Sequence, residues 1–255
     1  MTKTLILGGA TEARLLAGRL AARGDLDITL SLAGRTVEPA EQPVPVRSGG
    51  FGGPQGLARY LEDNEIDLLI DATHPYAARI SRNAAIAARL SGVPAFALRR
   101  APWKAIAGDR WTFVNGAQEA VTALGSEPRR VFLALGRQEI GAFAQAPQHA
   151  YVIRSVDPIE PPLDVPDADY ILARGPFAEA AERRLLADRR IQVIVAKNSG
   201  GSATYGKIAA ARALGIDVIL LQRPDVPDMP AVETVGEAVE MASHLLDSAV
   251  RKRGV

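Results

Sequence analysis

Two glycines directly after the first apolar run are the first residues whose spacing suggests chemistry. They follow the strand expected over residues 4–7 and precede a helix expected over residues 12–23. In a doubly wound sheet, the pyrophosphate of a dinucleotide meets backbone N–H groups and a helix N-terminus at this turn. The turn comprises Gly8, Gly9, Ala10, Thr11 and Glu12. Thr11 would cap the helix or bond a phosphate. Because the full Gly-x-Gly-x-x-Gly pattern is absent, a tight turn that binds nothing remains the alternative.

The end of the second expected strand, over residues 27–32, indicates which dinucleotide would bind. An NAD site usually carries an acidic residue there, about 20 residues after the glycines, for the ribose 2′-hydroxyl. This sequence instead has a hydroxyl and a guanidinium, which suit the 2′-phosphate of NADP. The predicted residues are Ser31, Ala33, Gly34 and Arg35. NADPH is therefore the favoured cofactor.

A third candidate segment follows the strand expected over residues 66–70, at the same sheet edge as the glycine turn. Its sequence is Asp71-Ala72-Thr73-His74-Pro75-Tyr76. On the functional interpretation this loop lies against the nicotinamide, with His74 or Tyr76 near the substrate. On the alternative, Thr73 or His74 caps the next helix and Pro75 occupies its first position. Spacing alone favours neither.

Five strands expected in the second half of the chain each run directly into a basic residue. These residues are Arg137, Arg154, Arg174, Lys197 and Arg223. The carboxyl ends of parallel strands share one sheet edge, where open α/β sheets bind ligands, so this set predicts a ligand with several negative charges. Asn198, Ser199, Gly200 and Gly201 would form an anion-binding nest beside it. A second mononucleotide site and unrelated surface arginines are the alternatives.

Composition excludes several other chemistries. The chain has 255 residues, of which 47% are hydrophobic and 23% charged, with a formal net charge of +1. It has no cysteine, which excludes disulfides, thiolate nucleophiles and cysteine-held metal centres. The three histidines have no metal-motif spacing, so no metal site is expected. The near-neutral charge argues against a nucleic-acid partner, and no apolar run approaches the ~20 residues of a membrane span. We expect a cytoplasmic protein that binds neither nucleic acid nor a membrane.

Strand-like runs alternate with alanine-rich helical stretches, which is typical of parallel α/β architecture. Further strands are expected over residues 93–98, 131–135, 151–153, 170–173, 191–196 and 218–221, and further helices over 57–64, 76–90, 178–188 and 202–214. A last helix opens with a capping box, Thr234 to Glu237. The alternation of strands and helices is interrupted near Pro102 and Trp103, which indicates a domain boundary there. We therefore predict two α/β domains, residues 1–100 for NADPH and residues 101–255 for the substrate.

Taken together, these segments resemble those of the precorrin-6A reductase family of corrin (vitamin B12) biosynthesis. The matching segments are residues 5–13, 71–77, 136–138, 174–177, 197–201 and 223–224. The resemblance implies two Rossmann-like domains with mostly parallel sheets and an active site in an interdomain cleft. It also implies hydride transfer from NADPH to a macrocycle carbon–carbon double bond of precorrin-6A, which gives precorrin-6B. A proton reaches the neighbouring carbon.

The resemblance also implies roles for the candidate residues. Those of the first half would hold NADPH, and the basic residues with the 198–201 nest would hold the acetate and propionate groups of a polycarboxylate tetrapyrrole. His74, Tyr76 and bound water are the candidate proton donors, and the product would pass to neighbouring pathway enzymes. Two other functions stay open: an NADPH-binding redox sensor, and an NADPH-dependent reductase or epimerase of a phosphorylated sugar.

Overall fold

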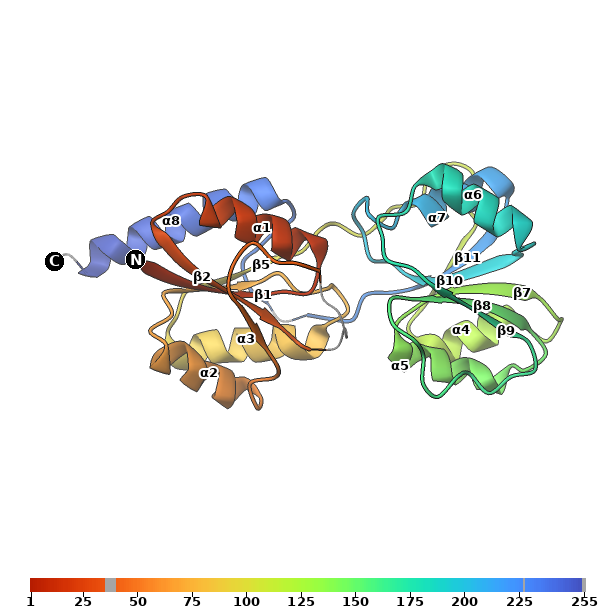
Figure 1. The fold of residues 1–255 in the computed structure, drawn as a ribbon, viewed down its shortest axis with the longest axis horizontal. Helices are drawn as coiled ribbons and strands as arrows, with labels where there is room; N and C mark the ends of the chain where they lie inside the picture. The colour runs from red at the N-terminus through yellow and green to blue at the C-terminus, as the bar shows by residue number, and fades with distance from the viewer. Residues whose placement is uncertain (35–39, 227, 254–255) are drawn as a thin grey trace. The chain divides into compact units, whose positions relative to one another are not determined.

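The chain folds into two compact units, each built around its own six-stranded sheet (Figure 1). The computed structural model describes residues 1–34, 40–226 and 228–253. The first unit contains Met1–Arg100 together with Pro224–Val255, and the second contains Ala101–Arg223. All strand pairs in both sheets are parallel. The predicted fold class, α/β with two Rossmann-like halves, is confirmed.

The first sheet has the order β12-β5-β4-β1-β2-β3. Its strands are β1 Thr2–Leu7, β2 Leu26–Leu32, β3 Val46–Ser48, β4 Leu68–Asp71, β5 Ala95–Leu98 and β12 Ala231–Val232. Its helices are α1 Thr11–Ala21, α2 Pro54–Asp63, α3 Ala78–Ser91 and α8 Val235–Arg253. The order reverses between β1 and β4. This is the topological switch point at which doubly wound sheets bind dinucleotides.

Helices cover both faces of this sheet, with α1 and α8 on one face and α2 and α3 on the other (Figure 1). The alternating side chains of β1 show why. Ile6 packs in the core below α1 and α8, whereas Leu5 and Leu7 pack against α2 and α3. A strand that is buried on both faces needs the continuous apolar run present in this sequence.

The C-terminal segment differs from the predicted division into residues 1–100 and 101–255. Residues 224–255, expected in the second domain, belong to the first unit. The N–H groups of Ala97 and Arg99 in the β5 region donate to the carbonyls of Pro230 and Val232, each at 2.8 Å. The apolar face of α8 packs against α1. Periodicity shows that a helix has an apolar face, but it does not show which sheet that face covers.

The second sheet has the order β6-β11-β10-β7-β8-β9. Its strands are β6 Trp111–Val114, β7 Arg130–Ala134, β8 Ala150–Ser155, β9 Ala168–Leu172, β10 Val193–Lys197 and β11 Asp217–Leu221. Its helices are α4 Ala117–Leu124, α5 Arg137–Ile140, the 3-10 helix η1 Gly141–Gln145, α6 Glu179–Asp188 and α7 Gly206–Leu214. Figure 1 shows α6 and α7 on one face of this sheet, and α4 and α5 on the other.

Most predicted elements are present, with boundaries shifted by a few residues. The short strands β3, β6 and β12 and the helix α4 were not expected from periodicity. The capping box of α8 is confirmed: the Glu237 carboxylate accepts the N–H groups of Glu233 (2.9 Å) and Thr234 (3.1 Å). The Glu237 N–H donates to the Thr234 hydroxyl at 3.2 Å. Within the described residues, no helix is long and apolar enough to cross a membrane.

A cluster of three charged residues is buried between β8, α6 and α7 of the second unit. Arg154 donates two hydrogen bonds to the Glu182 carboxylate, at 2.7 and 2.9 Å, and its guanidinium lies 3.7 Å from the centroid of the Phe177 ring. Lys207 is only 4% exposed and donates to the carbonyl of Thr204 at 2.8 Å. Burial, with a smaller contribution from the Arg154 charge, lowers the pKa of Lys207 to about 7.

The stability of the protein should therefore rise with pH above neutrality. Between the folded pKa of about 7 and the ordinary value of 10.5 for Lys207, the unfolded chain binds more protons than the folded chain. We expect the free energy of unfolding to increase by roughly 2 kcal/mol between pH 7 and 9 from this group. K207M should remove that increase, whereas K104M, at an exposed lysine, should keep it. Urea unfolding at both pH values measures this, and an unchanged pH dependence in K207M would contradict it.

Candidate functional site

The predicted glycine turn connects β1 to α1 at the carboxyl edge of the first sheet. The Gly8 N–H donates to the Ser31 carbonyl at 2.9 Å, and a Cβ on Gly8 would lie 2.6 Å from Cδ1 of Leu30. Gly9 has φ +117°, which side chains disfavour. Among the described residues no side chain caps α1, so Thr11 does not have the predicted capping role, and it stays exposed. The first N–H groups of α1 are thus left for a ligand at this edge.

The end of β2 carries the predicted hydroxyl of Ser31, which is buried. It is hydrogen-bonded to an arginine on β3 that the sequence analysis did not identify. Ser31 is buried, and its Oγ accepts a hydrogen bond at 2.9 Å from Nη1 of Arg47 on the neighbouring strand β3. Ala33 and Gly34 follow β2 in the loop, and Gly34 has φ +68°. The predicted Arg35 lies outside the described residues. Arg47 was missed because β3 has three residues, too few for a periodic signal.

Residues 71–76 form a compact turn after β4. Asp71 is buried, and its Oδ1 accepts hydrogen bonds from the Thr73 N–H (3.2 Å) and hydroxyl (2.6 Å), while Oδ2 lies 3.8 Å from Nη2 of Arg99. The predicted cap of the following helix is wrong, because α3 begins at Ala78 without a side-chain cap. The hydroxyl of Thr73 donates its hydrogen bond to Asp71 and not to a helix N-terminus.

His74 and Tyr76, the candidate proton donors, lie together in this turn. Nδ1 of His74 accepts the Tyr76 N–H at 3.3 Å, and the two ring centroids are 5.7 Å apart. Because Nδ1 is the acceptor, a neutral His74 ring carries its proton on Nε2.

A narrow crevice, too small to hold a water molecule, lies between the glycine turn and the turn after β4. Its lining residues are Ala10, Glu12, Ala72, Thr73, Pro75, Leu98 and Arg100. Arg100 pairs with the Glu12 carboxylate, so the acidic residue in the first turn of α1 is neutralised beside the predicted phosphate position. Ala72 is also fixed by its N–H bond to the Leu7 carbonyl at 2.9 Å. The structure thus brings the two predicted cofactor segments together.

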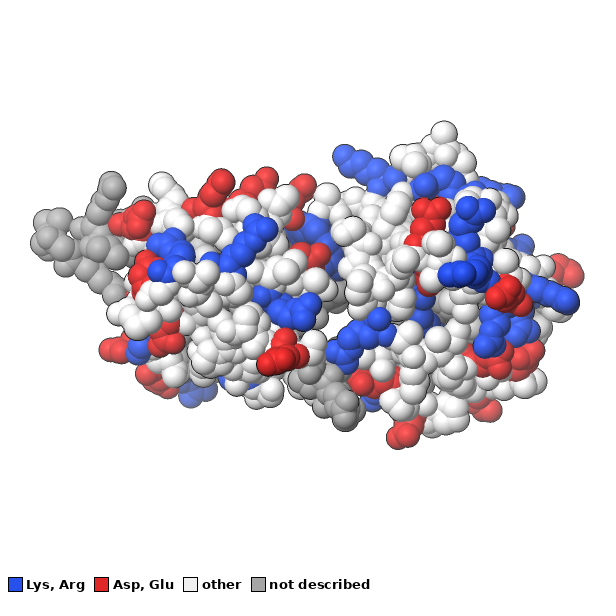
Figure 2. Space-filling view, turned by 45° about the horizontal axis from the view of Figure 1, so that its top comes forward, with Lys and Arg blue, Asp and Glu red and all other residues white. Residues whose placement is uncertain are grey.

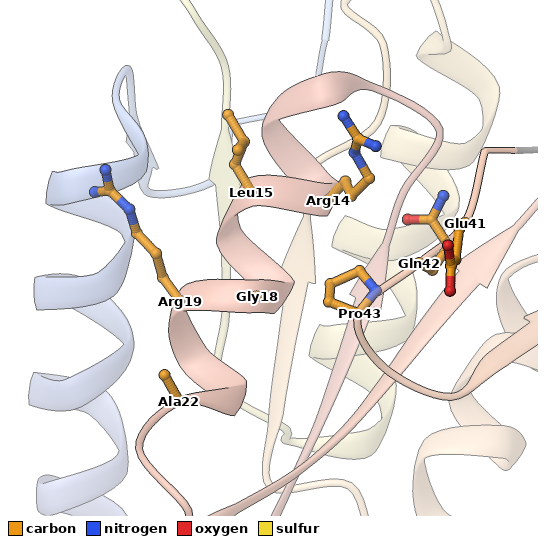
Figure 3. Close-up of a pocket in the computed structure, with 8 residues that line it drawn as sticks. All are labelled: Arg14, Leu15, Gly18, Arg19, Ala22, Glu41, Gln42 and Pro43. Atoms are coloured by element: carbon orange, nitrogen blue, oxygen red, sulfur yellow. The ribbon is translucent and has the colours of Figure 1, made fainter.

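A larger hollow lies on the outer side of α1. Figure 3 shows Arg14, Leu15 and Arg19 projecting from this helix, with Pro43 beside Gly18. Among the predicted site residues that the structure describes, none lines it. We assign no ligand to this surface.

In the second unit, parallel pairing places the carboxyl ends of the strands with basic residues at one sheet edge. Arg137, in the first turn of α5, is exposed and donates to the Pro158 carbonyl at 3.2 Å. Arg174, which follows β9, is also exposed. Lys197 ends β10 and lies 2.6 Å from the Glu139 carboxylate. Both signs of charge are scattered over the visible face of each unit, so the support for an anion at the second sheet comes from this local grouping and not from a broad basic surface (Figure 2).

The predicted role of Arg154 is wrong, because its side chain lies in the core and not at the sheet edge where the substrate was expected to bind. β8 extends to Ser155, so Arg154 is a strand residue on the same face as Val152, toward α6. There it forms the buried ion pair with Glu182. A guanidinium that is buried and donates two hydrogen bonds to a carboxylate is not presented to a ligand.

Asn198 also differs from its predicted role, since its side chain anchors the nest instead of lining it. Its Oδ1 accepts the Trp103 N–H at 2.8 Å, and its Nδ2 donates to the Trp103 carbonyl at 3.1 Å. The Trp103 indole N–H donates to the Gly201 carbonyl at 2.8 Å. Gly200 has φ +69°, and a Cβ there would lie 2.1 Å from the Ala101 carbonyl oxygen. Glycine is therefore required at this position.

Arg223 holds the same loop from the other side. Its Nε and Nη2 donate to the carbonyls of Asn198 and Ser199, each at 3.0 Å. These bonds make Arg223 a positioning residue for the 198–201 loop, and its contact with substrate stays a prediction. Lys197, Ser199 and the glycine backbone remain as candidate anion contacts.

Comparisons with known proteins agree with this geometry. The family model described as "Precorrin-6x reductase CbiJ/CobK" matches residues 3–243. A precorrin-6A reductase from Sinorhizobium sp is 60% identical over 97% of this chain and 95% of its own, and one from Rhodobacter capsulatus is 48% identical over the whole of both chains. The solved structure "CobK precorrin-6A reductase" has a TM-score of 0.92 and 47% identity, and the match covers 96% of this chain and 97% of that one. The chain belongs to the precorrin-6x reductase family.

Proposed function

We propose that the protein reduces a carbon–carbon double bond of precorrin-6A with NADPH, which gives precorrin-6B in cobalamin biosynthesis. The observation that carries this proposal is the 60% identity to a precorrin-6A reductase along nearly the whole chain. The two sheet edges support it, one with a dinucleotide-type turn and the other with a group of basic residues.

The first unit fits a nicotinamide dinucleotide. Its strand order is 3-2-1-4-5 with β12 added at the edge, the glycine turn follows β1, and no side chain caps α1. The residues that would hold NADPH are Gly8, Gly9, Ala10, Thr11, Glu12, Ser31, Ala33, Gly34, Arg35, Asp71, Ala72 and Thr73. NADPH supplies the hydride, so these residues bind and orient it and perform no acid–base chemistry themselves.

The second unit fits the carboxylates of the substrate. Arg137, Arg174 and Lys197 would bind acetate and propionate groups, with Ser199 and the backbone of Gly200 and Gly201 beside them. Fixed cations hold the macrocycle in one orientation, which a hydride transfer requires. Asn198 and Arg223 shape this site by holding the loop in place.

His74 is the favoured proton donor in this proposal, with Tyr76 and bound water as alternatives. The hydrogen bond to Nδ1 places the proton of the neutral ring on Nε2. Because a neutral imidazole is a very weak acid, His74 would donate a proton as the imidazolium, in which Nδ1 is also protonated and no longer accepts the Tyr76 N–H.

The activity itself is tested by adding precorrin-6A to the protein with NADPH or with NADH. We expect rapid loss of nicotinamide absorbance with NADPH and formation of precorrin-6B, and a rate at least about tenfold lower with NADH, because the end of β2 carries no acidic residue for a free ribose hydroxyl. NADPH binding without oxidation would contradict reductase activity on this substrate. The two alternatives, an NADPH-binding redox sensor and an NADPH-dependent reductase or epimerase of a phosphorylated sugar, would then be favoured.

Loss of one exposed cation should weaken substrate binding selectively. We expect R174Q to raise the KM for precorrin-6A by about tenfold, equivalent to one carboxylate contact of roughly 1.4 kcal/mol, with NADPH affinity unchanged. R183Q removes the same charge from the exposed surface of α6 and should change neither constant. Steady-state kinetics at fixed ionic strength measures both. Equal effects of the two variants would show that only the net charge matters.

The variant H74A distinguishes a role of His74 in proton transfer from a role in binding NADPH. If His74 delivers the proton, kcat should fall by about 10²-fold or more while the Kd of NADPH stays within about twofold. Single-turnover hydride transfer and fluorescence titration of NADPH make the two measurements. A large loss of NADPH affinity would instead identify His74 as a cofactor-binding or structural residue.

A further inference from the structure

We infer that Arg47 binds the 2′-phosphate of NADPH and is the residue that selects NADPH over NADH. This inference rests on the proposed nucleotide site in the first unit. Arg47 lies on β3, paired in register with Ser31 at the carboxyl end of β2. It stands outside every segment that the sequence pattern singled out.

A short series of hydrogen bonds connects Arg47 with the glycine turn. The Gly8 N–H donates to the Ser31 carbonyl, and the Ser31 hydroxyl accepts from Nη1 of Arg47, both at 2.9 Å. In a dinucleotide-binding sheet the adenosine ribose lies at the end of the second strand, once its pyrophosphate occupies the turn after the first. Because the Arg47 guanidinium is hydrogen-bonded to Ser31 at the end of β2, it lies next to the expected position of the ribose 2′ oxygen.

No carboxylate of the described residues neutralises the charge of Arg47. Its guanidinium donates to neutral acceptors, the Ser31 hydroxyl and the carbonyls of Gly49 (3.1 Å) and Gly50 (3.2 Å). Within the part of the chain that the structure describes, Arg47 makes no ion pair with an acidic group, unlike Arg99 and Arg100 at the same edge. A partly buried guanidinium in this state favours an anion, and phosphate suits its planar donor geometry.

Aromatic packing fixes the orientation of this guanidinium in advance. Its central carbon lies 3.8 Å from the centroid of the Phe51 ring and 5.1 Å from that of Tyr60. Stacking and three hydrogen bonds restrict the rotamers of a long side chain, so little conformational entropy remains to be lost when a phosphate binds.

The residues around the ribose position agree with a phosphate rather than a hydroxyl. From the end of β2 to the last described residue of its loop, the sequence is Ser31-Leu-Ala-Gly34, without a carboxylate. An acidic side chain there would accept a hydrogen bond from a free 2′-hydroxyl and repel a 2′-phosphate. The alternative role for Arg47 is purely structural, as a clamp on the carbonyls of Gly49 and Gly50.

Calorimetric titration of the full chain with NADP⁺ and NAD⁺ separates these roles without an activity assay. We expect R47Q to raise the Kd of NADP⁺ by about 30-fold or more and that of NAD⁺ by no more than about twofold, because only NADP⁺ carries the phosphate. R59Q removes the same charge at an exposed position of α2 and should leave both constants unchanged. R47K keeps the charge without the planar fork and should give an intermediate Kd for NADP⁺ with normal NAD⁺ binding.

Several results would overturn the inference. A parallel loss of both affinities in R47Q identifies Arg47 as a structural clamp, and unchanged NADP⁺ binding removes its role. A selective loss in R35Q, with none in R47Q, transfers the role to Arg35. If R47Q fails to fold, as judged by urea unfolding, normal NADP⁺ binding by R47K overturns the inference. Failure of the unmodified protein to bind either nucleotide is a different result, which contradicts the proposed function itself.

Discussion

Because the strands of each sheet pair only in parallel, every segment that leaves a strand at its carboxyl end joins the same edge of that sheet. This constraint makes two sites from segments far apart in the sequence. In the first unit it brings the glycine turn, the end of β2 and the turn after β4 together around β1. In the second unit it gathers Arg137, Arg174 and Lys197. The helices and cores described above position these edges, and the candidate binding residues lie mostly in the loops that follow the strands.

Much of this arrangement is predictable from the sequence because buried parallel strands leave a strong local signal. Continuous apolar runs mark β1 and β4, and the glycines after β1 mark the turn. The short strands β3 and β12 leave no such signal, because two or three residues show no periodicity. Their positions are set by pairing with β2 and β5, which are distant in sequence. Arg47 and the C-terminal segment were missed or misplaced for this reason.

Arg154 and Arg137 show why a residue type at a strand end does not by itself define a site. Both follow apolar strands in the sequence, yet Arg154 is buried against Glu182 and Arg137 is exposed. β8 continues two residues beyond its predicted end, which turns the Arg154 side chain toward α6. A burial this deep is tolerated only because the Glu182 carboxylate satisfies the guanidinium. Such a pair depends on two elements 28 residues apart in sequence, which local pattern cannot reveal.

The discontinuous first unit has a consequence for synthesis on the ribosome. The second unit is an insertion whose boundaries, Ala101 and Arg223, both contact the 198–201 loop, so it is complete once residue 223 has emerged. The first unit then still lacks β12 and α8, and the apolar face that α8 covers stays open to water. We therefore expect the usual order, in which the N-terminal domain folds first, to be reversed here. The first unit reaches its final form only after β12 and α8 have been made.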